Sequence, residues 1–139
     1  MAGLGARFRE VRLALLAWGL VLYARVGLSI LGYRKLARHL PQPGAGRAPV
    51  AYLQRLRRRV TAAARYVPNG SCLPQAIAGQ MLLSWRGYRS EIHLGVRAGQ
   101  GGGLAAHAWL TSDDVVVVGD LGINLEDYAH LTVLRAAET

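Results

Sequence analysis

The spacing of apolar residues changes once along this chain, near Glu91, and that change limits the folds open to it. Before Glu91, apolar residues such as Leu53 and Leu56 recur every three or four positions, as on one face of an α-helix. After Glu91, residues such as Ile92 and Leu94 alternate with polar ones, which is typical of a half-buried β-strand. Helices that come first and strands that come later predict an α+β fold, with N-terminal helices followed by a small antiparallel sheet.

Turn-forming residues divide these patterns into separate elements. The segment 41–46 holds two prolines and two glycines, which end any helix that precedes it. A Pro-Asn-Gly turn at 68–70 follows, and Ser71 can then cap a helix that starts at Cys72. The sequence therefore predicts helices at 8–39 (one long or two shorter), 50–66 and 72–85, and strands at 91–97, 104–111, 114–120 and 131–134.

The chain has 139 residues, which is the length of one domain. We expect residues 1–48 to form a helical segment that packs on a core spanning 49–139, in one compact unit overall.

The first apolar segment raises the question of targeting. Arg7, Arg9 and Arg12 precede an apolar run at 13–24, an order that is typical of a signal peptide. The run has 12 residues, whereas a membrane-spanning helix needs roughly 18. Arg25 interrupts it, and no convincing small-residue cleavage site follows. We therefore expect a helix packed on the rest of a cytoplasmic protein, with a membrane-surface helix as the alternative.

Basic side chains are concentrated in the first half of the chain. Residues 1–70 carry 13 basic side chains and 1 acidic one, whereas residues 71–139 carry 4 basic and 7 acidic ones. Such a distribution suits nucleic acid, an anionic membrane or an acidic peptide as a partner. The run Arg57–Arg59 lies on a predicted helix, where it forms either a solvated face or a docking surface.

Cys72 is the only cysteine, which excludes an internal disulfide and a multi-cysteine zinc module. His39 and His130 match no metal-ligand spacing. The glycine run at 101–103 does not lie between a strand and a helix, as a phosphate-binding loop would. We therefore expect no metal and no other cofactor.

Cys72 and His107 are the first candidates for a chemical site. At a helix N-terminus, unpaired backbone N–H groups favour the thiolate of Cys72 and can stabilise an oxyanion beside it. The alternative for Cys72 is a small buried hydrophobic residue. His107 lies among alanines in a predicted strand, which leaves room for another group at its ring. The alternative for His107 is a structural histidine satisfied by the backbone.

Asp120 ends the next predicted strand, and the hairpin register decides whether it reaches His107. A loop at 112–113 makes Asp120 a diagonal neighbour of His107, whereas a loop at 113–114 places the two directly opposite. Cys72, His107 and Asp120 would then supply a nucleophile, a base and an acid that orients the base. The alternative for Asp120 is plain turn chemistry.

The remaining aromatic and histidine side chains favour structural roles. Trp85 and Trp109 are expected in the core or along a groove, and His93 on the solvated face of its strand.

The segments around the three candidate residues resemble those of transglutaminase-like cysteine proteases. These segments are Ser71-Cys72-Leu73, Ala106-His107-Ala108-Trp109 and Val118-Gly119-Asp120. More narrowly, residues 60–120 resemble the stand-alone leader peptidases of lasso-peptide biosynthesis, with Arg65-Tyr66-Val67-Pro68 before the cysteine and the segment 82–88 after it.

This resemblance implies a cysteine endopeptidase whose catalytic triad is Cys72, His107 and Asp120. The substrate would be a ribosomally made precursor peptide, from which the enzyme removes the leader. A separate leader-recognition protein would be its partner, because residues 1–50 lack the pattern of a fused recognition domain. The ATP-dependent macrolactam cyclase would act on the product, and no nucleic acid is expected to bind.

Two other functions stay open from the sequence. An acyl transferase of the same superfamily would pass the acyl group to an amine instead of to water. A non-catalytic binding module would use the basic helices on a membrane or on nucleic acid, and Cys72 would be inert.

Overall fold

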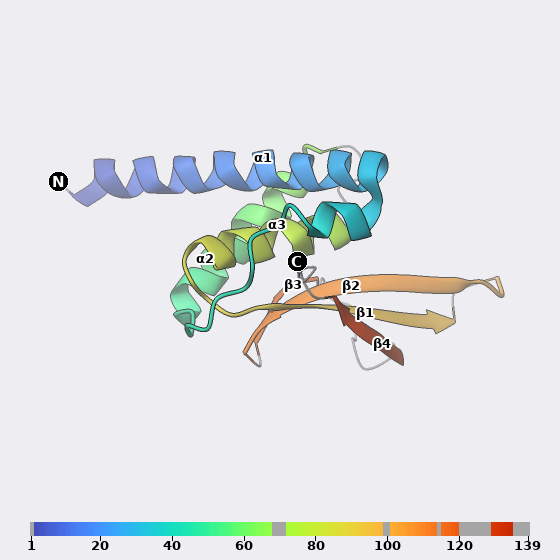
Figure 1. Cartoon of the computed structure of the whole chain (residues 1–139). Helices are drawn as coiled ribbons and strands as arrows, with labels where there is room; N and C mark the ends of the chain where they lie inside the picture. Colours follow the sequence, from blue (N-terminus) through green and yellow to red (C-terminus); the bar gives the residue numbers. More distant parts are fainter. Residues whose placement is uncertain (1, 68–71, 99–100, 114, 120–128, 135–139) are drawn as a thin grey trace.

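The computed structural model describes residues 2–67, 72–98, 101–113, 115–119 and 129–134. In these segments, helices precede an antiparallel sheet, which confirms the predicted α+β fold (Figure 1). The helices are α1 (Ala2–Ala37), α2 (Val50–Ala64) and α3 (Cys72–Trp85), and the strands are β1 (Glu91–Ala98), β2 (Leu104–Ser112), β3 (Val115–Val118) and β4 (Ala129–Leu134).

The helices and the sheet form three layers (Figure 1). α1 packs across α2 and α3, and these two helices in turn cover one face of the sheet. The strand order is β3-β2-β1-β4, so β2 is an inner strand and β3 lies at an edge. The middle layer therefore contacts both α1 and the sheet.

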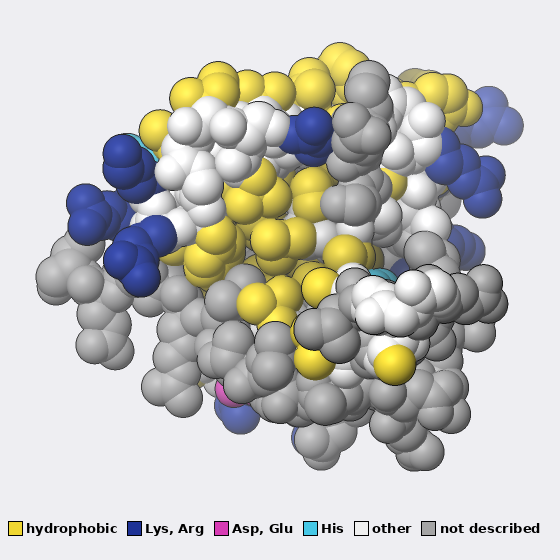
Figure 2. Space-filling model, turned by 90° about the vertical axis from the view of Figure 1, so that its right-hand side faces the viewer, with side chains coloured by type: hydrophobic (Ala, Val, Ile, Leu, Met, Phe, Trp, Pro, Cys, Tyr) yellow, Lys and Arg dark blue, Asp and Glu magenta, His cyan; other side chains and the backbone are white. Residues whose placement is uncertain are grey.

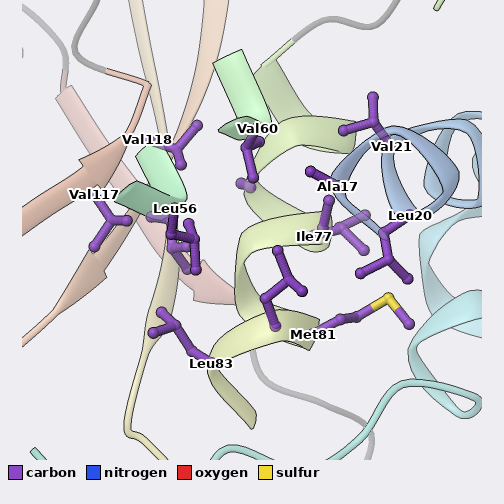
Figure 3. Close-up of a cluster of buried hydrophobic side chains, with 14 of the residues drawn as sticks. Ala17, Leu20, Val21, Leu56, Val60, Ile77, Met81, Leu83, Val117 and Val118 are labelled. Atoms are coloured by element: carbon purple, nitrogen blue, oxygen red, sulfur yellow. The ribbon is translucent and has the colours of Figure 1, made fainter. Parts of the chain in front are cut away.

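α3 is the most buried element of the described chain. Every residue from 74 to 83 is buried. Figure 3 shows Ile77 and Met81 of α3 on the side of Leu20 from α1, while Val118 of β3 lies on the other side of α3. A helix that is apolar on all sides belongs in a core, and α3 accordingly lies between the other two layers.

Gly79 allows α3 to lie close to β2. A Cβ atom at this position would lie 2.6 Å from Cδ2 of Leu110 on β2 and 3.4 Å from Cδ2 of Leu56 on α2. Both leucines are fully buried, so neither side chain can move aside without disturbing its neighbours. The absence of a side chain at Gly79 thereby sets the spacing between α3 and β2.

α1 is broken at Gly32, whose backbone angles (φ 74°, ψ 166°) are not helical. The predicted helix at 8–39 is thus two helices separated by a kink. The first continues through Arg25, as the predicted helix at 8–39 does. By length and composition alone, α1 is the one helix of the described chain that could cross a membrane.

The hairpin of β2 and β3 combines two registers. Ser112 pairs with Val115, as a loop at 113–114 predicts. A bulge then shifts the register, and Leu110 pairs with Val118. The constant register assumed from the sequence is therefore wrong beyond the bulge, because an extra residue in one strand changes every later pair.

An ionic bridge joins α1 to α2. The carboxylate of Glu10 accepts hydrogen bonds from Nε of Arg55 at 2.8 Å and from Nη2 of Arg59 at 2.7 Å. The hydrogen bond from Arg59, supported by Arg55, lowers the pKa of Glu10 below its ordinary value. The only acidic residue in the first half of the chain is thus bound to the neighbouring helix.

Replacing Glu10 by glutamine should lower the melting temperature at neutral pH, because both arginines lose their carboxylate. A carboxyl group with a lowered pKa stabilises the fold above its ordinary pKa of 4.5, and this contribution is lost as the pH falls through the folded-state pKa. Circular dichroism should therefore show melting temperatures of wild type and Glu10→Gln that differ near neutral pH and converge in acid. A difference that persists unchanged into acid would contradict this role.

Candidate active site

Cys72 is the first residue of α3, at the helix end where backbone N–H groups lack partners within the helix. Its side chain is half-buried. The backbone N–H of Ala108 on β2 donates a hydrogen bond to Sγ of Cys72 at 3.4 Å. The sulfur therefore lies between the N-terminus of a helix and an N–H group of a strand.

His107 precedes Ala108 on β2 and is buried, with 8 % of its surface exposed. It pairs with Gly95 of β1, which has no side chain to compete for the space. Nε2 of His107 donates a hydrogen bond to the carbonyl oxygen of Gly119. Because a carbonyl can only accept, the hydrogen lies on Nε2, and Nδ1 is the ring nitrogen that can take up a proton.

Gly119 reaches His107 in a conformation that other residues rarely adopt. Its φ is +106°, and a Cβ atom would lie 2.8 Å from both the carbonyl oxygen of Ala108 and Cα of Trp109. The chain that leaves β3 therefore passes directly against β2 beside the histidine. Gly119 was not predicted as a site residue, and its place in the family-like segment 118–120 is the signal that pointed to this position.

Asp120, the predicted acid of the site, lies outside the described residues. The structure places Cys72 against Ala108, the neighbour of His107 on β2. In the described chain, the carbonyl of Gly119 accepts a hydrogen bond from the His107 ring and helps to orient it.

Trp109 stacks between two histidine rings on one face of the sheet. Its ring centroid lies 6.1 Å from that of His107 and 5.5 Å from that of His93. Nε2 of His93 also lies 2.8 Å from Oγ1 of Thr111, and the side chain is only 17 % exposed. The expectation of a solvated His93 is therefore wrong, because β1–β2 pairing places it opposite Trp109. The stack supports the ring of His107 from one side.

The described residues contain no group of three His, Cys, Asp or Glu side chains close enough to hold a metal ion. The described residues place a thiol against a backbone N–H group of β2, the strand that also carries an imidazole. Such a set can form and break bonds at a carbonyl carbon.

Arginines line hollows on the helical side of the molecule. Arg59 binds Glu10 and lines neither of the two described next, so the predicted surface at 57–59 is divided. A hollow of about 270 Å³ on α2 is lined by Arg57, Arg58, Thr61, Ala62 and Arg65. Another, of about 350 Å³, is lined by Arg9, Arg12, Leu13, Leu16, Tyr52, Arg55, Leu82, Trp85 and Arg86.

The match to a known protein family covers most of the chain. The family model of the transglutaminase-like superfamily matches residues 18–135. The chain belongs to the transglutaminase-like superfamily. The matched region includes α2, α3 and all the named strands, and so contains both Cys72 and His107. Members of this superfamily are generally cysteine peptidases or acyltransferases. No curated protein and no solved structure gave a significant match.

Replacing Gly119 by alanine should destabilise this transglutaminase-like fold by about 1–3 kcal/mol, because the new Cβ meets β2 and φ is positive. Gly102→Ala is the matched control, since Gly102 also has a positive φ (+86°) but nothing within 4 Å of the new Cβ atom. Urea denaturation measures both variants. Equal losses of unfolding free energy in the two variants would show that the contact with β2 adds nothing beyond backbone strain.

Proposed function

We propose that this transglutaminase-like protein is a cysteine endopeptidase that removes the leader from a lasso-peptide precursor, with Cys72, His107 and Asp120 as catalytic residues. The observation that carries this proposal is the contact of Cys72 Sγ with the backbone N–H of Ala108, the neighbour of His107. This contact joins a nucleophile at a helix N-terminus to the strand that carries a base.

The first half of the reaction forms a thioester. His107 takes the thiol proton on Nδ1, while its Nε2 stays bonded to Gly119, and the thiolate of Cys72 attacks the scissile carbonyl carbon. The N–H groups at the start of α3 stabilise the negative charge that develops on the carbonyl oxygen. His107 then gives the proton to the leaving nitrogen, and the core peptide departs with a free amine.

The second half of the reaction hydrolyses the thioester. His107 removes a proton from water, the resulting hydroxide attacks the thioester carbon, and the carbon–sulfur bond breaks. The leader leaves with a new carboxyl group, and Cys72 regains its proton. Asp120 stabilises the positively charged imidazole in both halves. Acyl transfer to an amine would share the first half and differ only in the second.

The leader-peptidase specificity rests on the likeness of the segments 71–73, 106–109 and 118–120 to lasso-peptide leader peptidases. The proposed partner is a separate leader-recognition protein. The free amine of the core is the group that an ATP-dependent cyclase needs to close a macrolactam. The proposed reaction takes place in the cytoplasm, requires no cofactor and involves no nucleic acid.

Mass spectrometry of a precursor peptide tests this function. The full-length protein is incubated with the precursor encoded beside it, with and without the leader-recognition protein. We expect wild type to release leader and core, Cys72→Ala to release neither, and His107→Ala to be slower by about 10³-fold or more. His39→Ala replaces an exposed histidine outside the site and should cleave at the wild-type rate.

Two results would redirect the proposal. Leader amides that accumulate when a small amine is added, at the expense of free leader acid, would assign the protein to acyl transfer. A folded wild-type protein that binds leader and partner but cleaves nothing would reject the peptidase and leave a binding module.

The basic hollow on α2 is the proposed docking surface for the leader-recognition protein or an acidic segment of the leader. It is lined by Arg57, Arg58 and Arg65, and no acidic side chain lines it. Guanidinium groups bind carboxylates in a bidentate manner, which suits an acidic peptide.

Reversing the charge at Arg57 and Arg58 should reduce partner-dependent cleavage about five- to tenfold at low salt, because exposed charges mainly accelerate association. The loss should shrink as salt rises, since salt screens such charges. Arg38→Glu, at an exposed arginine on another part of the surface, is the control. With a saturating partner, the double variant should cleave at the wild-type rate. If the double variant binds its partner as tightly as wild type does, the hollow on α2 is not the docking surface.

A further inference from the structure

α1 is apolar on two opposite faces. Its inner face, which includes Ala17 and Val21, is buried against α2 and α3. On the outer face, Leu4, Phe8 and Leu15 are 79 %, 70 % and 65 % exposed. The outer apolar ridge, as we name this face, consists of Leu4, Phe8, Val11, Leu15, Trp18, Val26 and Ile30. Successive members lie three or four residues apart, except that Trp18 and Val26 lie eight residues apart.

The outer apolar ridge is long and open. From Leu4 to Ile30 it extends over roughly 39 Å, given a rise of about 1.5 Å per residue. Figure 2 shows hydrophobic side chains along the top of the molecule, where α1 lies, with basic side chains to either side. Exposed apolar side chains over such a length mark an interaction site in a soluble protein.

The charges around the outer apolar ridge identify its partner. α1 carries six basic side chains and a single acidic one, Glu10, which is bound to Arg55 and Arg59 of α2. The helix therefore presents positive charge beside an exposed apolar surface. Anionic lipid headgroups above an apolar bilayer interior match both properties. Trp18 and Tyr23, both partly exposed, are residue types that favour the headgroup level.

The packing of α1 decides between a helix that lies on the membrane and one that crosses it. A crossing helix would have to leave α2 and α3, and would expose their apolar side chains to water. It would also break the bridge from Glu10 to Arg55 and Arg59. A helix that lies in the membrane surface keeps all of these contacts and covers the outer apolar ridge.

We propose that α1 is an in-plane membrane anchor, which binds the surface of an anionic bilayer through the outer apolar ridge and its flanking arginines. Because the sheet lies on the opposite side of α2 and α3 from α1, the contact between Cys72 and β2 faces away from the bilayer (Figure 1). This inference is independent of the reaction that the site performs.

Flotation of the purified full-length protein with vesicles tests the anchor. We expect wild type to float with vesicles that contain phosphatidylglycerol, and at least about tenfold more weakly with pure phosphatidylcholine. The double variant Phe8→Glu, Leu15→Glu should lose binding to both by at least about tenfold, because charge replaces the apolar contact. Tyr66→Glu is the matched control, since Tyr66 is 78 % exposed but lies outside α1.

Folding is checked by the melting temperature, which the double variant should keep, because both side chains are exposed. Wild type that stays with the soluble fraction, and elutes as a dimer that the double variant abolishes, would overturn the proposal in favour of self-association. Protein that resists alkaline carbonate extraction would overturn it in favour of a crossing helix. If the double variant binds vesicles as well as wild type does, the outer apolar ridge is not the anchor.

Discussion

The close approach of α3 to β2 at Gly79 is the contact on which the rest of the site depends. Because no side chain intervenes there, α3 rests on Leu110, and its first residue reaches β2 about two helical turns before Gly79. Ala108 lies beyond the last pair of β2 with β3, so its N–H group is available to the sulfur of Cys72. The short distance between the backbones of α3 and β2 thus brings Cys72 to β2.

Hydrophobic periodicity was sufficient to predict the order of helices and strands, because each element in the middle of the chain buries one face or all of its faces. It did not reveal the break at Gly32 or the bulge between β2 and β3. Both features involve one residue within an otherwise regular pattern. An average over many residues, which is what periodicity measures, therefore passes over them.

The sequence predicts side chains for the candidate site but not the backbone groups that contact them. Cys72 and His107 are uncommon residue types at positions where helix and strand boundaries suggest reactivity. The groups that contact them are the backbone N–H of Ala108 and the backbone carbonyl of Gly119. Nearly every residue carries such backbone groups, so the sequence does not single these two out. Only the tertiary structure tells which backbone groups lie beside the sulfur and the imidazole. A bulge that shifts the pairing by one residue is enough to change that selection.

The sequence of α1 fits a buried helix as well as it fits a surface one, because apolar residues occur on both of its faces. The structure shows which face of α1 is buried, since α2 and α3 cover the face of Ala17 and leave the face of Leu15 exposed. The bond from Glu10 to α2 holds the covered face in place, so the exposed face has a fixed direction relative to the sheet. The same stack of layers that brings Cys72 to β2 therefore also directs the outer apolar ridge to the opposite side of the molecule (Figure 1).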